Sequence, residues 1–211
     1  MGHWYLVRHG ETDWNLTERI QGQVDVTLNA TGRRQVSHLA RRLEDVRIDA
    51  IYSSDLVRTH ETAQIIAADR DIAIATDPDL REFSFGEWEG LTSEEIEARQ
   101  PGAMAERMSA GNEAFAAPGG EDTWQVLERV RSFCERTAER HDPSEDILVV
   151  AHGGSIRALA VALLDLAVTD FWRFRIHCAS LAIIRNHADG RTLVRWNDIS
   201  HLPAGDRDTP I

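Results

Sequence analysis

The sequence predicts an α/β fold: a three-layer α/β/α sandwich with a mostly parallel central sheet and a small helical cap insertion. Short apolar segments alternate with segments whose apolar residues recur at helical spacing, which is typical of a sheet covered by helices. The segment 146–151 is almost continuously apolar, as expected of a strand buried on both faces. Residues 77–120 break the alternation with prolines, glycines and short helical patterns, which indicates an insertion that shapes a site from above the sheet.

The first half of the chain predicts strands and helices in alternation. Residues 4–8 are an apolar run typical of a strand. Asn29 is a suitable N-cap for a helix that extends to about Arg42, because the apolar residues that follow it share one face. The other elements expected in this half are a strand over 49–53, a helix over 56–68 and a short strand over 72–75.

The second half continues the pattern and ends in a hairpin. Asp189-Gly190 is a strong hairpin signal between the last two strands. From Pro203 the chain is polar, and we expect the tail 203–211 to fray. No linker divides residues 1–211, so one domain is expected. The elements expected here are short helices over 93–99 and 103–109 in the insertion, a helix over 121–140, a strand over 146–151, a helix over 156–166, and strands over 181–185 and 192–196.

Composition restricts the class of partner. The net charge is −12, from 23 basic and 35 acidic residues, which argues against nucleic acid and against anionic membrane surfaces as partners. Cys134 and Cys178 stand in no metal-ligand spacing and are expected to be free thiols in a reducing cytoplasm. No signal peptide is visible, and the longest apolar stretch, 158–164, is too short to span a bilayer.

Two predicted strands end in the same His-Gly pair. His9-Gly10 follows the strand 4–8, and His152-Gly153 follows the strand 146–151. The carboxyl ends of neighbouring parallel strands form the ligand crevice of such sheets, so the two imidazoles are expected to meet there. A neutral imidazole can accept a phosphoryl group, which makes His9 a candidate nucleophile. Taken alone, each motif has an alternative interpretation, in which its histidine is a structural residue.

Other residues near these strand ends suit phosphate binding. Arg8 precedes the first histidine, and Arg58 follows the second strand, where its guanidinium would face the same edge of the sheet. Gly153 begins a segment whose helix N-terminus would present free N–H groups to an anion. Glu82 lies among aromatic residues, where desolvation would keep it partly protonated as a proton donor. The sequence is equally consistent with a second interpretation, in which Glu82 is a solvated charge in a loop.

Three further residues follow the first histidine. Asn15, Gln21 and Gly22 are candidate hydrogen-bond donors to the phosphoryl oxygens, or they are turn residues. The acidic pairs Glu94-Glu95 and Asp206/Asp208 have no metal-ligand pattern and are interpreted as solvated charge. Neither a metal nor another cofactor is expected.

Taken together, these segments resemble the histidine phosphatase superfamily, also called the phosphoglycerate-mutase-like family. The resemblance extends over about residues 4–186, and the motifs are highly specific in combination. The matching segments are Arg-His-Gly-Glu-Thr at 8–12 with Asn15 after it, the Gln21-Gly22…Asp25…Leu28…Gly32 series, Ser53-Ser54-Asp55-Leu56 with Arg58-Thr59 and Thr62-Ala63, Leu80-Arg81-Glu82 with Gly86 to Leu91, and Val150 to Gly154.

The resemblance implies a three-layer fold and a phosphohistidine intermediate without a metal. His9 would be the nucleophile and Glu82 the proton donor, while Arg8, Arg58 and His152 would form the phosphate pocket. The expected partner is a small phosphorylated metabolite, and a homodimer is left open because members of the family are often dimers.

The resemblance also implies a choice between a phosphatase and a mutase. The cofactor-dependent phosphoglycerate mutases carry a longer insertion, an Asn-Glu-Arg-His-Tyr-Gly type segment around the acid and a pair of arginines for the substrate carboxylate. Here the acid lies in Arg-Glu-Phe-Ser-Phe-Gly, and residues 100–120 contain one arginine, Arg107. We therefore expect the short phosphatase branch, a metal-independent phosphomonoesterase, with the mutase as the alternative. α-Ribazole phosphate, glucosyl-3-phosphoglycerate, phosphoserine and broad specificity all stay open as substrate choices.

Overall fold

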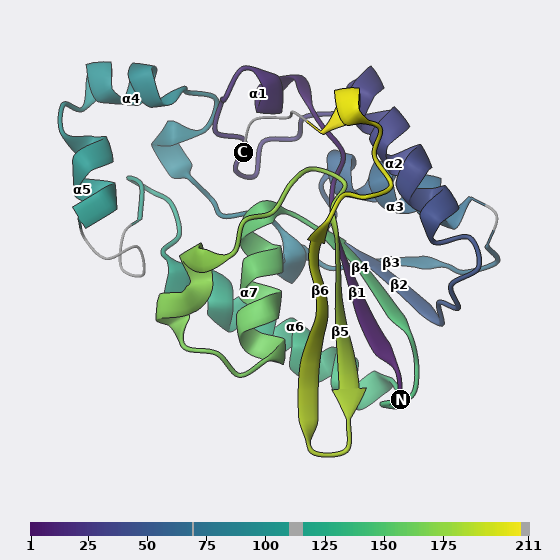
Figure 1. Cartoon of the computed structure of the whole chain (residues 1–211). Coiled ribbons are helices and arrows are strands. Elements are labelled where there is room, and N and C mark those ends of the chain that lie inside the picture. The colour runs from purple at the N-terminus through teal and green to yellow at the C-terminus, as the bar shows by residue number, and fades with distance from the viewer. Residues whose placement is uncertain (69, 110–115, 208–211) are drawn as a thin grey trace.

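A six-stranded sheet runs through the centre of the computed structural model, which describes residues 1–68, 70–109 and 116–207 (Figure 1). The strand order is β3-β2-β4-β1-β5-β6. The first four strands in this order are parallel to one another, and β5 and β6 are antiparallel additions at one edge. The mostly parallel sheet is confirmed. The strands are β1 His3–Arg8, β2 Ala50–Ser53, β3 Ile74–Thr76, β4 Ile147–Ala151, β5 Leu181–His187 and β6 Gly190–Asp198.

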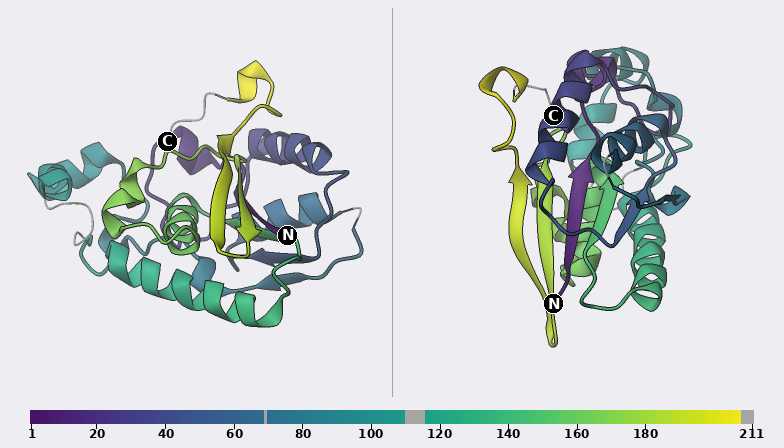
Figure 2. Two further views of the ribbon diagram at one scale, coloured as in Figure 1. Left: turned by 60° about the horizontal axis from the view of Figure 1, so that its bottom comes forward. Right: turned by 90° about the vertical axis from the view of Figure 1, so that its right-hand side faces the viewer.

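Helices cover both faces of the sheet, so the three-layer sandwich is also confirmed. Side chains alternate along each strand, so Leu6 and Val149 pack against one pair of helices. Val7 and Val150 pack against the other pair. Figure 2 shows the two long helices α6 and α7 together on one side of the sheet. The covering helices are α2 Ala30–Arg42 and α3 Val57–Ala67 on one face, and α6 Thr123–Arg140 and α7 Gly153–Leu163 on the other.

Local capping sets where the helices begin. The side chain of Asn29 accepts a hydrogen bond from Gly32 N at 2.8 Å and starts α2 as predicted. Asp122 accepts from Gln125 N at 2.8 Å and starts α6 in the same way. A cap of this kind stabilises a helix by roughly 1 kcal/mol.

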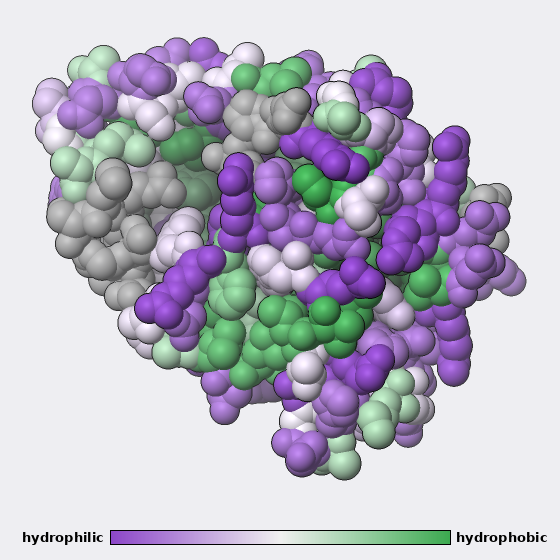
Figure 3. Space-filling model, viewed as in Figure 1, coloured by the Kyte–Doolittle hydropathy of each residue, from purple (hydrophilic) through white to green (hydrophobic). Residues whose placement is uncertain are grey.

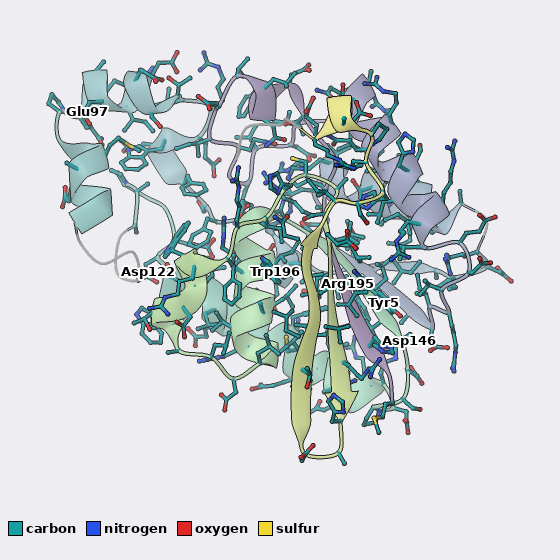
Figure 4. The ribbon with its side chains drawn as sticks, viewed as in Figure 1. Tyr5, Glu97, Asp122, Asp146, Arg195 and Trp196 are labelled. Carbon is teal, nitrogen blue, oxygen red and sulfur yellow. The ribbon has the colours of Figure 1, made fainter. Side chains whose placement is uncertain are left out.

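The insertion forms a cap beside the sheet. It has a small apolar core of its own, to which Trp88 and Ile96 contribute. The carboxylate of Glu97 accepts a hydrogen bond from Gly102 N at 2.6 Å and joins the two cap helices, which lie far from the sheet (Figure 4). The elements of the insertion are the short 3-10 turns η1 Pro78–Leu80 and η2 Gly86–Trp88 and the helices α4 Ser93–Arg99 and α5 Ala103–Ser109.

Several predicted boundaries were wrong. Helix α7 begins at Gly153 rather than Ile156, because His152 takes the N-cap position and its N–H is bound by Ser155 Oγ at 3.0 Å. The helix ends at Leu163 rather than Leu166. The short helix α1, Asp13–Leu16, was missed. Its capping box pairs Thr12 with Asn15 rather than with glutamate or glutamine. The hairpin loop is 188–189, one residue earlier than predicted.

The C-terminal tail does not fray over 203–207. It forms the short turn η4, Ala204–Asp206, whose last carbonyl accepts from Gln35 Nε2 at 2.9 Å on α2. Leu202 before it is buried. Arg34 Nη2 also contacts Asp206 Oδ1 at 3.3 Å, and Arg207 Nε donates to Leu202 O at 2.8 Å. These contacts hold a segment that its polar composition predicted to fray. Residues 208–211 lie outside the described part.

Two smaller expectations concern the cysteines and membrane spans. Both Cys134 and Cys178 are free. Within the described residues, no helix is both long enough and apolar enough to cross a membrane.

Candidate active site

The two predicted histidines lie side by side at the carboxyl end of the sheet. Strands β1 and β4 pair up to Arg8 and Ala151, so His9 and His152 are the next residues along each strand. The backbone N–H of His9 still donates to Ala151 O at 3.1 Å. The two ring centroids are 5.3 Å apart, and both side chains are buried. The spatial meeting of the two imidazoles, on which the predicted chemistry depends, is present.

His9 presents one free ring nitrogen. Its Nδ1 lies 2.7 Å from Gly10 O, and a carbonyl only accepts, so Nδ1 carries the proton and Nε2 keeps its lone pair. Burial, and then the charges of Arg58 and Arg8, hold the pKa of His9 well below its ordinary value. The ring is therefore neutral at pH 7, as a nitrogen nucleophile must be.

His152 is held by a hydroxyl that the sequence analysis did not single out. Its Nε2 lies 3.0 Å from Ser54 Oγ, at the end of β2. Its Nδ1 is buried and has no hydrogen-bond partner among the described residues. Burial, and then the charges of Arg58 and His9, hold the pKa of His152 well below its ordinary value. When Ser54 donates to Nε2, the proton of the neutral ring lies on Nδ1.

Two guanidinium groups complete this end of the sheet. Arg8 Nη1 donates to Ile176 O at 2.8 Å. Arg58 is fully buried and donates from Nη1 to Val24 O at 2.8 Å and from Nη2 to Gly22 O at 2.7 Å. Burial lowers the pKa of Arg58 to about 10, so it stays charged at pH 7. The carbonyl bonds fix both planar groups in one orientation.

The site contains buried donors that nothing in the described chain satisfies. Arg8 Nε and Arg58 Nε have no hydrogen-bond partner among the described residues, and neither does His152 Nδ1. Leaving a buried donor unpaired costs roughly 1–3 kcal/mol, and more for a charged group. Three such nitrogens on residues grouped around His9 are suited to bind an oxyanion, and phosphate matches the guanidinium geometry.

Glu82 lies against the N-terminus of α7. Its Oε1 accepts from Phe83 N at 3.0 Å, and Gly154 N donates to Oε1 and Oε2 at 3.0 and 3.1 Å. A Cβ on Gly154 would overlap Glu82 Oε1 and the ring of Phe83. Glycine at this position is what allows the carboxylate to reach the helix end.

A cavity of about 360 Å³ opens over these groups. Figure 3 shows this face of the molecule hollowed between the cap and the body. His152 and Gly153 are not among the lining residues, since His152 is fully buried. The predicted residues that line it are Arg8, His9, Asn15, Gln21, Gly22, Arg58 and Glu82, and the additional ones are Trp14, Glu18, Arg19, Ile20, Phe85 and Ser93.

The three predicted donors after His9 differ in their bonds. Asn15 Oδ1 accepts from Thr12 N at 3.0 Å, which leaves its NH₂ group for a ligand. Gly22 uses its carbonyl to hold Arg58, so it acts on phosphate only through that arginine. Gln21 Oε1 is buried without a partner in the described chain and lies in the cavity wall.

The sequence analysis assigned no role to several residues that the structure places at the site. Ser54 directly follows β2, so its strand-end position was a signal that could have found it. Thr62 Oγ1 accepts from Gly10 N at 3.2 Å, but a threonine inside a helix looks unremarkable in a sequence. The cavity residues Arg19 and Glu18 follow a short helix that was not predicted, so their direction could not be inferred.

Comparison with known proteins agrees with this geometry. The sequence profile of the histidine phosphatase superfamily (branch 1) matches residues 4–199. The chain belongs to the histidine phosphatase superfamily. Phosphoserine phosphatase 1 of Hydrogenobacter thermophilus is 32% identical and covers 93% of this chain and 92% of its own. Phosphoglycerate mutase-like protein 4 of Arabidopsis thaliana is 36% identical, with 93% and 85% covered.

Solved structures give the same result for this histidine phosphatase. A mycobacterial glucosyl-3-phosphoglycerate phosphatase, solved in complex with VO3, superposes with a TM-score of 0.85 at 34% identity. The match covers 93% of this chain and 99% of that one. The named phosphatases among its relatives support phosphate-ester hydrolysis as the activity of this member of the superfamily.

Proposed function

We propose that the protein is a metal-independent phosphomonoesterase that hydrolyses a small phosphorylated metabolite through a phosphohistidine on His9. The observation that supports this most is the set of buried nitrogens on Arg8, Arg58 and His152 that have no hydrogen-bond partner in the described part of the chain and that surround the neutral ring of His9. Their arrangement suits three phosphoryl oxygens with a nucleophile beside them.

In the first step a phosphate monoester dianion binds between the two guanidinium groups. The lone pair of His9 Nε2 attacks phosphorus, and the bond between phosphorus and the ester oxygen breaks. The electron pair leaves with that oxygen, which takes a proton from Glu82. Arg8 and Arg58 neutralise charge on the equatorial oxygens, and the neutral His152 ring donates a hydrogen bond to one of them. This electrostatic positioning supplies most of the catalysis in phosphoryl transfer.

In the second step water releases the phosphate. Glu82, now a carboxylate, takes a proton from water as the water oxygen attacks phosphorus. The P–N bond breaks, its electron pair returns to His9 Nε2, and inorganic phosphate leaves. The site is then restored with Glu82 protonated and His9 neutral.

The cavity wall favours hydrolysis over the mutase alternative. A mutase for phosphoglycerate needs free cations for the substrate carboxylate. Arg19 lines the cavity, but both of its Nη atoms bind Glu95, at 2.6 and 3.0 Å, and Nη1 also binds Gly90 O. The side chain of Arg107 lies outside the described residues.

Trapping the intermediate tests the proposal. We expect ³²P-labelled phosphoester to label the wild-type protein with acid-labile, base-stable phosphate, and His9→Ala to lose the label and about 10³-fold or more of the rate. His187→Ala, at the far end of β5, is the matched control and should keep both. Near-normal turnover of p-nitrophenyl phosphate by His9→Ala would rule the mechanism out.

The remaining expectations stay predictions. A cytoplasmic location and the exclusion of nucleic acid and membranes as partners rest on composition alone. A panel of phosphorylated metabolites, including phosphoserine and glucosyl-3-phosphoglycerate, ranked by kcat/KM, would choose the substrate. Gel filtration would decide whether the chain forms a homodimer.

A further inference from the structure

Arg129, in the second turn of α6, lies against the segment that carries Glu82. Its Nη1 donates to Asp79 O at 2.7 Å and to Arg81 O at 2.8 Å. Its Nη2 donates to Glu82 O at 3.0 Å. One guanidinium therefore binds three backbone carbonyls within four residues of chain, and the last of them belongs to Glu82.

Glu121 closes the other side of this arrangement. Its carboxylate accepts from Arg129 Nε at 2.9 Å and Nη2 at 3.1 Å, and both side chains are largely buried, at 21% and 15% exposed. Glu121 Oε2 also accepts from Ser84 N at 2.8 Å. All five N–H donors of Arg129 are thus used, and lysine, with three donors on one point, could not reproduce them.

The bonds hold the backbone on both sides of the acid. The Glu82 carbonyl is bound by Arg129, and the Ser84 amide two residues later is bound by Glu121. Gln23 Nε2 donates to the same Glu82 carbonyl at 3.2 Å. With its backbone fixed in this way, the Glu82 side chain extends toward Gly154 N, which it reaches at 3.0 Å.

We propose that Arg129 and Glu121 are positioning residues, a backbone clamp that sets Glu82 at the distance proton transfer requires. This rests on the proposed function of Glu82 as the proton donor. Neither residue is among the lining residues of the cavity, so the clamp reaches Glu82 through the segment it binds, and Arg129→Lys keeps the positive charge that also acts on His152. Proton transfer to a leaving oxygen needs heavy atoms about 2.6–3.2 Å apart, so a small displacement of the segment is enough to slow it.

The leaving group separates this role from general support of the fold. An alkyl oxygen is a poor leaving group and needs the proton, whereas p-nitrophenolate leaves well without it. For Arg129→Lys and Glu121→Gln we expect kcat/KM on glycerol phosphate to fall about 10²-fold and on p-nitrophenyl phosphate less than about threefold. Equal losses on the two esters, or no loss on glycerol phosphate, would overturn the clamp.

Arg136 provides the matched control on the same face of α6. It binds the side chains of Asp77 and Asp79, each at 2.8 Å, and none of its recorded bonds reaches the backbone at Glu82. Arg136→Lys should leave the ratio between the two esters unchanged, although it replaces a guanidinium by an ammonium group just as Arg129→Lys does. If Arg136→Lys changed the ratio as much as Arg129→Lys does, any disturbance of the η1 segment would have the same effect. That result would overturn the clamp.

The amide of Gly154 reports the position of Glu82 without turnover. In an ¹⁵N-labelled protein we expect the Gly154 N–H resonance to shift, and its hydrogen-exchange protection to fall at least tenfold, in both clamp variants and not in Arg136→Lys. An unchanged Gly154 amide would overturn the clamp. Wild-type protein inactive on both esters would instead refute the proposed function, and the amide measurement would still decide the clamp.

Discussion

The backbone amide of Gly154 donates to both carboxylate oxygens of Glu82, at 3.0 and 3.1 Å. Glu82 lies inside the insertion and Gly154 lies outside it, so the contact joins the loop after η1 to the first turn of α7. The free N–H groups at such a helix end bind the carboxyl oxygens and hold them in one position. The contact therefore holds the acid at the start of α7, whose N-cap residue is His152.

We expect Gly154→Ala to lose about 10²-fold or more in kcat/KM on alkyl phosphates. The new methyl would overlap Glu82 Oε1 and the ring of Phe83, so the acid must move away from the leaving oxygen. Overpacking costs about 1–3 kcal/mol of stability, which urea unfolding would measure separately. Gly205→Ala, where a methyl meets open space, is the control. Normal kinetics for Gly154→Ala would contradict the assigned role of Glu82.

The hydroxyl of Ser54 should decide which nitrogen of His152 carries the proton. Without it, the neutral ring can place the proton on either nitrogen, and only Nδ1–H suits a phosphoryl oxygen. We expect Ser54→Ala to reduce kcat about tenfold, and Ser54→Thr to restore most of it because the hydroxyl is kept. Ring ¹⁵N shifts of His152 should show the Nδ1–H form in the wild type and a mixture in Ser54→Ala. Pure Nε2–H in the wild type would refute this assignment.

The sequence predicted the strands, the main helices and the central site residues because each depends on short-range signals. His9 and His152 directly follow apolar strands. Arg58 lies in the first turn of α3, the helix that follows the apolar strand β2. The supporting residues were missed because their partners are remote in sequence. Arg129 looks like an ordinary helix arginine until the loop at Glu82 folds against it. Gly22 looked like a phosphate donor because no pattern shows that its carbonyl faces Arg58.

Stability should fall as the pH drops below about 6.5. Burial lowers the pKa values of His9 and His152 in the folded state, so below the ordinary value of 6.5 the unfolded chain binds protons that the folded chain does not. Between its folded pKa and 6.5, each ring makes the free energy of unfolding rise by about 1.4 kcal/mol per pH unit. Above pH 6.5 the two rings add no pH dependence. Urea unfolding between pH 5 and 8 would measure it, and His152→Asn should reduce the slope. A slope unchanged in that variant would contradict the assignment.

Chelation should leave the activity intact. Arg8 and Arg58 supply fixed positive charge where a metal would otherwise neutralise the phosphoryl oxygens. We expect kcat on p-nitrophenyl phosphate to change less than about twofold after EDTA treatment and gel filtration, and added Mg²⁺ or Zn²⁺ to give no increase. Loss of activity that a metal restores would contradict the metal-independent mechanism.

Releasing Arg19 should shift specificity toward esters that carry a carboxylate. In the wild type Glu95 binds both Nη atoms of Arg19 and offsets its charge at the cavity wall. Glu95→Gln keeps the capping bond to Thr92 N, because an amide oxygen also accepts, but removes the negative charge. The Arg19 charge then acts on the ligand, so we expect the KM for 3-phosphoglycerate to fall roughly threefold, a small effect because the pair is solvent-exposed.

Two comparisons make that result specific. Glycerol phosphate is of similar size but has no carboxylate, so its KM should stay constant in Glu95→Gln. Glu94→Gln removes a neighbouring carboxylate on α4 that makes no recorded bond to Arg19, so it should leave both KM values unchanged. Equal changes for the two esters would mean that Glu95 supports the cap and not the charge of the cavity. Net isomerisation of 3-phosphoglycerate by Glu95→Gln, with bisphosphoglycerate primer and without phosphate release, would show that this ion pair separates the phosphatase from the mutase.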